Sequence, residues 1–232
     1  MKKTLPSGCT MTRQETGNGF LYFAFQLLFL PSLLFAANDM LPHPADTAQL
    51  NFVYYFVNFL AMLFLFHSYL GKHAAQIRKH PALLCQAVIL GLAAYYACFF
   101  ALDKAIAWLF PGFANRNNEA IASMLSQNPF LMVLGTVVLV PPFEECIFRG
   151  LIFGNLYKRS RWAAYAVSIL FFALIHILGY WGTYSPLEIC IALVQYLPAG
   201  LCLAWSYTKA ETVFAPILIH AAVNYITIQS LR

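Results

Sequence analysis

Residues 129–157 read PFLMVLGTVVLVPPFEECIFRGLIFGNLY, a stretch that is apolar except near its centre. A run of about 20 apolar residues is long enough to cross the hydrocarbon core of a bilayer as a helix. The pair Pro141-Pro142 is expected to break or bend this helix, because proline lacks a backbone N–H. Two glutamates follow at once, Glu144 and Glu145. Charges deep in a spanning segment cost roughly 2.5–3.5 kcal/mol each, so this stretch indicates both a membrane fold and a functional site.

The composition of the whole chain also indicates a membrane protein. Of its 232 residues, 61% are hydrophobic and only 10% are charged, whereas soluble domains carry about 25% charged residues. This excludes an ordinary water-soluble enzyme, a disordered chain and a fibrous repeat. We expect an all-α, polytopic bundle with about seven transmembrane helices, since helices satisfy every backbone group in lipid. The expected spans are residues 20–37, 52–70, 81–101, 129–157, 162–179, 186–207 and 212–231.

The positions of the basic residues predict an orientation. If seven spans alternate, most of the bases fall on one side of the membrane, and the positive-inside rule places that side and the N-terminus in the cytosol. We expect a multi-pass integral protein, in the plasma membrane if the source is prokaryotic. The net charge of +5 is then an orientation signal, and the lipid bilayer rather than nucleic acid is the expected partner. The predicted cytosolic side carries Lys2, Lys3, Arg13, Lys72, Arg78, Lys79, Lys158, Arg159, Arg161 and Lys209, and the opposite side carries Lys104, Arg116 and Arg232.

Two further apolar segments contain polar groups that lipid would not tolerate. His176 lies in the fifth segment, and His220 and Asn224 lie in the seventh. At 1.5 Å per residue, these groups and Glu145 lie about 16–22 Å along their helices from the nearest predicted cytosolic base. We therefore expect three helices to bring their polar side chains to one level of the membrane.

Spacing along each helix predicts which groups share a face. Glu145 and Arg149 are four residues apart and are expected to pair, as are His220 and Asn224. Glu144 is rotated from Glu145 by about 100°. Two adjacent carboxylates in a medium of low dielectric constant do not both ionise readily, and Arg149 can hold only one of them as a carboxylate. The arrangement suits a general base in a buried, wet cavity. Each pair alone could instead be a structural contact between helices.

These residues resemble three motifs of the CAAX protease and bacteriocin-processing enzyme family, also called the CPBP or ABI family. The segment from Glu144 to Gly150 is similar to its EExxxR motif, Phe172 to His176 to its FxxxH motif, and His220 to Asn224 to its HxxxN/D motif. Order and spacing agree across all three. We therefore divide the chain into residues 128–232, a CPBP-like intramembrane protease core, and residues 1–127, transmembrane helices without a recognised motif.

The resemblance implies an intramembrane glutamate endopeptidase. Under it, Glu144 and Glu145 are the catalytic pair and Arg149 is their electrostatic partner. We favour Glu144 as the base that activates water together with His176, because Glu145 shares the face of Arg149. His220 and Asn224 would donate hydrogen bonds to the oxygen of the tetrahedral intermediate. The expected substrate is a membrane-embedded or lipid-anchored peptide that reaches the site from the cytosolic side or the bilayer.

Alternatives to this chemistry and function stay open. No cofactor is expected, but zinc is the mechanistic alternative, with Glu144, His176 and His220 as ligands. The six cysteines have no CxxC spacing, and five lie in apolar segments, which predicts small buried hydrophobic residues rather than a metal cage. A catalytically silent family member, acting as a bacteriocin-immunity or partner-binding membrane protein, is the alternative function. A proton-coupled transporter is less favoured, since no inverted repeat is evident.

Overall fold

The computed structural model describes residues 10–232, and within that range every regular element is a helix. Lys2, Lys3 and Cys9 lie outside the described residues. The all-α class predicted from composition is confirmed. The helices are α1 Arg13–Leu28, α2 Leu30–Asp39, α3 Thr47–Leu65, α4 His67–Lys79, α5 Pro81–Leu109, α6 Arg116–Gln127, α7 Pro129–Val133, α8 Val140–Glu145, α9 Gly154–Tyr157, α10 Arg161–Leu178, α11 Pro186–Ala210 and α12 Phe214–Ser230, with π-helical segments η1 Leu134–Leu139 and η2 Cys146–Phe153 and the 3₁₀ turn η3 Trp181–Thr183.

Five helices among the described residues are long and apolar enough to cross a bilayer. They are α3, α5, the continuous helix Pro129–Tyr157, α10 and α11. A sixth span results if α1 and α2, which are bent by 46° at their junction, count as one. The helix α12 has 17 residues, at the lower end of the ~17–25 that spanning helices use. The expected number of seven spans is therefore not confirmed, whereas the polytopic architecture is.

The helix Pro129–Tyr157 passes through Pro141-Pro142 without a break, so of the two expected outcomes, a break or a bend, the break does not occur. The backbone is π-helical over η1, immediately before the prolines, and again over η2, immediately after the glutamates. Single wide turns of this kind accommodate irregular hydrogen bonding within a helix and are frequent at functional sites. Glu144 and Glu145 thus occupy the short α8 segment between two π-helical stretches.

Local sequence signals explain where several helices begin. Ser185 and Glu188 form the capping box predicted by their spacing: the Glu188 backbone N–H donates to Ser185 Oγ, and the Ser185 N–H donates to the Glu188 carboxylate at 2.8 Å. Asn128 accepts a hydrogen bond from the Leu131 N–H, and Pro129 follows it at the first helical position. Both arrangements satisfy N–H groups that the first turn of a helix leaves unpaired.

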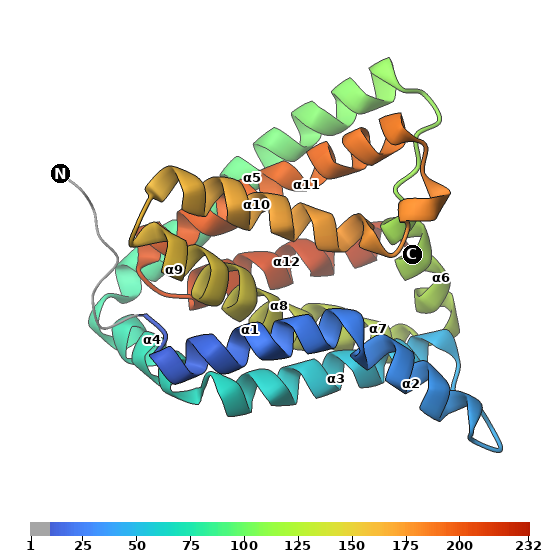
Figure 1. Ribbon diagram of the computed structural model, residues 1–232. Coiled ribbons are helices and arrows are strands. Elements are labelled where there is room, and N and C mark those ends of the chain that lie inside the picture. Colours follow the sequence, from blue (N-terminus) through green and yellow to red (C-terminus); the bar gives the residue numbers. More distant parts are fainter. Residues whose placement is uncertain (1–9) are drawn as a thin grey trace.

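The helices pack side by side into one bundle (Figure 1). The helix α11 packs against α5, α10 and α12, and α12 packs against the helix that carries the glutamates. Gly200 allows α11 to approach α10 closely, because a Cβ there would lie 2.9 Å from Ile169 Cγ2. The largest core cluster surrounds η2, where Phe148, Leu151 and Phe153 are at most 1% exposed. The helix with the glutamates therefore forms the centre of the fold.

The cysteines agree only in part with the sequence-based expectation. All five described cysteines are free thiols, and Cys146 and Cys202 are buried as expected. Cys85, Cys98 and Cys190 are exposed on the outside of the bundle instead. An apolar segment in a membrane bundle faces lipid as well as neighbouring helices, so an apolar sequence does not by itself predict burial within the protein.

Candidate active site

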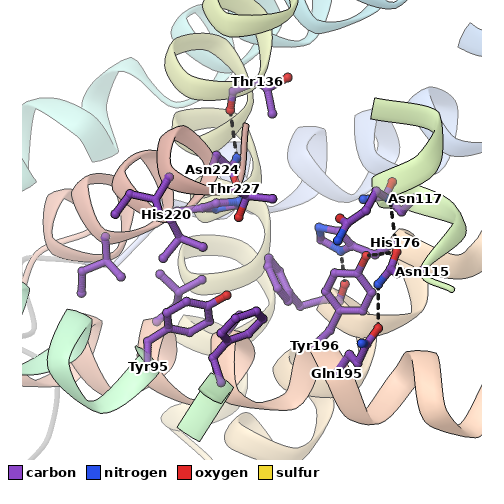
Figure 2. A pocket seen from close by; sticks show the side chains of 18 of the residues that line it. Tyr95, Asn115, Asn117, Thr136, His176, Gln195, Tyr196, His220, Asn224 and Thr227 are labelled. Carbon is purple, nitrogen blue, oxygen red and sulfur yellow. Dashed lines mark hydrogen bonds between the residues drawn. The ribbon is translucent and has the colours of Figure 1, made fainter. Parts of the chain in front are cut away.

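A cavity of about 500 Å³ lies between α5, α6, α10, α11, α12 and the helix Pro129–Tyr157. Four of the six predicted site residues line it: Glu144, His176, His220 and Asn224. The other two, Glu145 and Arg149, lie behind the wall with fully buried side chains. In Figure 2, His220 and Asn224 lie on one side of the cavity and His176 on the other. The structure thus brings polar groups from three helices to one place.

Glu145 connects Arg149 to His220. Its Oε1 atom accepts a hydrogen bond from Arg149 Nη1 at 3.0 Å and another from His220 Nδ1 at 2.8 Å. Arg149 Nη2 also donates to the backbone carbonyl of Gly200 at 3.3 Å, and its guanidinium lies 4.6 Å from the ring centroid of Phe172. A carboxylate held by arginine can only accept, so His220 Nδ1 carries a hydrogen. The buried chain Arg149–Glu145–His220 therefore fixes the tautomer and orientation of His220.

Glu144 is the more accessible glutamate. Its side chain is 16% exposed, against 0% for Glu145. Its Oε2 atom lies 3.9 Å from His220 Nε2 and has no hydrogen-bond partner among the described residues. Glu144 also lines a second cavity of about 160 Å³, which Gln26, Tyr54 and Asn58 help to form. Glu144 thus borders both cavities and has one buried carboxylate oxygen without a hydrogen-bond partner among the described residues.

His176 faces the cavity from the end of α10. Its Nδ1 atom donates to the carbonyl oxygen of Phe172 at 2.7 Å, because a carbonyl can only accept. The Nε2 atom therefore has a free lone pair that can accept a proton. The imidazole also lies against Tyr196, with ring centroids 4.4 Å apart. Among the described residues no hydrogen bond joins His176 to Glu144, so the predicted partnership would have to act through a molecule bound between them.

Asn224 makes a contact that the sequence did not reveal. Its Nδ2 atom donates to the backbone carbonyl of Thr136 at 2.9 Å (Figure 2). The carboxamide has a second hydrogen for a ligand, since each NH₂ group donates twice. His220 and Asn224, one helical turn apart on α12, therefore share a face as predicted, but each is already held by a neighbour from the helix with the glutamates.

Sequence reasoning missed three groups around the site. Tyr196 covers one side of His176, and the carbonyls of Thr136 and Gly200 hold Asn224 and Arg149. The sequence could not indicate which backbone carbonyls take part, because every residue has one. The tyrosine in an apolar segment was a weak signal, since aromatic residues are common there.

The predicted zinc ligands are not grouped as a metal site. Among residues 10–232, no three His, Cys, Asp or Glu side chains are close enough together to hold a metal ion. Glu144, His176 and His220 are therefore not grouped as metal ligands in the described part of the chain.

The fold and the cavity define a class: a helical membrane protein with paired glutamates and histidines inside the bundle. Residues 126–226 match the family described as type II CAAX prenyl endopeptidase Rce1-like. The resemblance inferred from the three motifs is confirmed, because residues 126–226 are similar to this family.

Individual relatives give a similar result. The chain is 27% identical over 123 residues to the "Putative membrane peptidase YdiL" of Bacillus subtilis, covering 52% of this chain and 46% of that protein. It is 28% identical over 111 residues to the UPF0177 protein YxdF of Lactococcus lactis, covering 47% of this chain and 55% of that protein. The chain thus spans about half the length of these curated relatives. No solved structure matches it significantly.

Proposed function

We propose that this protein is an intramembrane endopeptidase that hydrolyses a peptide bond in a membrane-associated or lipid-anchored substrate. The observation that carries the proposal is Glu144, a carboxylate open to the cavity beside His220, with Glu145 held separately by Arg149. The match to the Rce1-like family and the printed name of the Bacillus relative support a peptidase. No observation specifically favours a catalytically silent protein, because all three motifs are intact and each contributes at least one residue to the lining of one cavity.

Glu144 acts as the general base in this proposal. It takes a proton from a water in the cavity, and the resulting hydroxide attacks the carbonyl carbon of the scissile bond. The tetrahedral intermediate collapses when the C–N bond breaks, and protonated Glu144 gives its proton to the leaving amine. The immediate products are a carboxylic acid and an amine, and the acid then transfers its proton to the amine to give a carboxylate and an ammonium group. His176 Nε2, with its free lone pair, accepts a hydrogen bond from the water and orients it.

His220 and Asn224 stabilise the oxygen of the intermediate. Both residues line the cavity: the Asn224 carboxamide retains a second hydrogen, and His220 Nε2 can donate when it is protonated. Donors fixed in advance at the position where negative charge develops typically contribute about 2.7–4 kcal/mol each to catalysis. Arg149 and Glu145 act as positioning residues, because they hold His220 without touching the cavity.

Metal-independent chemistry is part of the proposal. The three candidate ligands are not arranged for zinc, and Arg149 lies close to the carboxylates, where its charge opposes that of a cation. The proteolysis proposed here is therefore expected to survive chelation.

The test compares cells that express the wild type with cells that express Glu144→Gln, Glu145→Gln or His176→Ala. The peptide termini of the membrane proteome are identified by mass spectrometry in each strain. A matched control is Glu188→Gln, which alters a glutamate at the start of α11, away from the cavity. We expect one or more new termini in the wild type and the control that are lost in the Glu144→Gln and His176→Ala strains. Identical termini in all strains would refute the proposal.

A further inference from the structure

The two ends of the bundle differ in charge. Helix ends that lie on one side carry eight described bases against two acids, and those on the other side carry three bases against five acids. Figure 1 shows α4 and α9 at the first end, and α2, α6 and the C-terminus at the second. We call them the basic end and the acidic end. The basic end carries Arg13, Lys72, Arg78, Lys79, Lys158, Arg159, Arg161 and Lys209 with Glu15 and Glu211; the acidic end carries Asp39, Asp46, Asp103, Glu119 and Glu188 with Lys104, Arg116 and Arg232.

Along the helix with the glutamates and along α12, the cavity extends from Glu144 toward the acidic end, and exposed Phe100 and Ile226 line its lateral side. On the helix with the glutamates, it is lined by residues before Glu144, such as Thr136, and not by the described residues after it. On α12 it continues from His220 to Ser230, ten residues or about 15 Å nearer the acidic end. Its outermost lining residues include Ser230 and Asp103, both of which are exposed. The cavity therefore reaches the surface at the acidic end.

On the helix with the glutamates, the second cavity reaches only as far as Phe148, and the space beyond it toward the basic end is filled. Arg149, Phe148, Leu151 and Phe153 follow the glutamates and are at most 1% exposed. Beyond them, Tyr69 is fully buried and its hydroxyl donates to that of Tyr207 at 3.2 Å. No residue of α4 or α9 is among the described residues that line the cavity. A peptide approaching from the basic end would have to displace this packed core.

We infer that the substrate reaches Glu144 from the acidic end of the bundle, which the positive-inside rule places on the extracytoplasmic side. The substrate is then an extracytoplasmic or outer-leaflet segment of a membrane-associated protein, and not a cytosolic tail. That a substrate enters this cavity rests on the proposed function. The side from which it enters rests on the geometry of the cavity. It differs from the approach from the cytosol, one of the two routes that the sequence had suggested, and is compatible with the other, an approach from the bilayer.

The lining of the cavity indicates which peptides fit. Among the described residues it contains no lysine or arginine, and its acidic groups are Asp103 and Glu144. Such a lining repels a free carboxylate and favours a neutral or basic segment. The mouth also carries amide side chains from α6 and α11, including Asn118 and Gln195, and amides can both donate to and accept from a peptide backbone. The site thus suits an internal peptide segment rather than a C-terminal carboxylate.

Thiol labelling tests the side of access. In a background that keeps the buried Cys146 and replaces the other five cysteines with serine, single cysteines are introduced as Ser230→Cys at the cavity mouth, Thr227→Cys one turn deeper, and Lys158→Cys at the basic end as the matched control. A membrane-impermeant sulfonated maleimide is applied to intact bacterial cells and to inverted membrane vesicles. We expect Ser230→Cys and Thr227→Cys to react in intact cells, and Lys158→Cys to react only in inverted vesicles.

The inference is overturned if Ser230→Cys and Thr227→Cys react only in inverted vesicles, if they react from the same side as Lys158→Cys, or if neither reacts from either side. Labelling reports the side of access whether or not the protein cleaves a peptide. Each cysteine variant is therefore also combined with Glu144→Gln, and both labelling and peptide cleavage are measured. Labelling from the cytosolic side with cleavage lost in Glu144→Gln refutes the side of access alone. Labelling from outside with cleavage unchanged in Glu144→Gln refutes the proposed function alone.

Discussion

The buried pair Glu145–Arg149 allows a quantitative prediction that does not depend on finding a substrate. Both side chains are completely buried, and Arg149 Nη1 lies 3.0 Å from Glu145 Oε1. At that separation and an effective dielectric constant of about 20, the attraction between unit charges is about 5 kcal/mol. Removing one partner of a buried pair leaves the other charge unpaired and typically costs about 3–5 kcal/mol. We therefore expect Arg149→Met to lower the free energy of unfolding by about 3–5 kcal/mol, and Glu145→Gln to lower it by a similar amount.

The double variant provides the stricter test. With both charges removed, no unpaired charge remains, so the loss in Glu145→Gln/Arg149→Met should be well below the sum of the two single losses. Reversible unfolding in mixed micelles, followed by circular dichroism as the fraction of denaturing detergent rises, gives the three free energies. Arg116→Met is the matched control, because the Arg116–Glu119 pair is exposed to solvent, and it should have no measurable effect. An Arg149→Met loss below about 0.5 kcal/mol, or single losses that simply add, would refute the reasoning.

Further predictions concern the oxyanion donor, the contact between α10 and α11, and the role of metal. Asn224→Ala should lower kcat about 10²–10³-fold, measured by peptide hydrolysis, and a variant of near wild-type rate would contradict the role of its carboxamide. Gly200→Val should lower the free energy of unfolding by about 1–3 kcal/mol, because the added Cβ would lie 2.9 Å from Ile169. The control in the same unfolding assay is Gly182→Ala, whose added Cβ meets no atom within 4 Å. Equal stability of the two variants would contradict the close approach of α10 and α11. Chelation by 1,10-phenanthroline should leave the rate of hydrolysis unchanged, and a loss reversed by zinc would show that a metal is required.

The contacts within one helix could be predicted from the sequence, because helical periodicity alone determines them. Spacing of four residues predicted the Glu145–Arg149 pair, and the structure forms it at 3.0 Å. Counting residues along each helix from the nearest predicted cytosolic base predicted that the polar groups of three helices lie at one level. His220 does contact Glu145, although the two residues are 75 positions apart in the sequence.

Contacts that depend on how each helix is rotated about its own axis could not be predicted. The bond from Asn224 to the carbonyl of Thr136 is one example, and the position of Tyr196 against His176 is another. Thr136 lies within the π-helical segment η1, whose wider turns change the rotation of Thr136 relative to Glu144. The two prolines indicated an irregularity, but not that the helix would widen rather than break. The side on which the cavity opens likewise depends on packing between helices that share no sequence motif.

The central claim is that Glu144 is the base of a peptidase. The most direct measurement uses the purified protein in liposomes with a library of membrane-anchored peptides whose cleavage products are read by mass spectrometry. The account predicts that the wild type cleaves at least one peptide, that Glu144→Gln loses this activity while retaining the wild-type unfolding transition, and that Glu188→Gln cleaves like the wild type. Cleavage by folded Glu144→Gln at the rate of the wild type would contradict it.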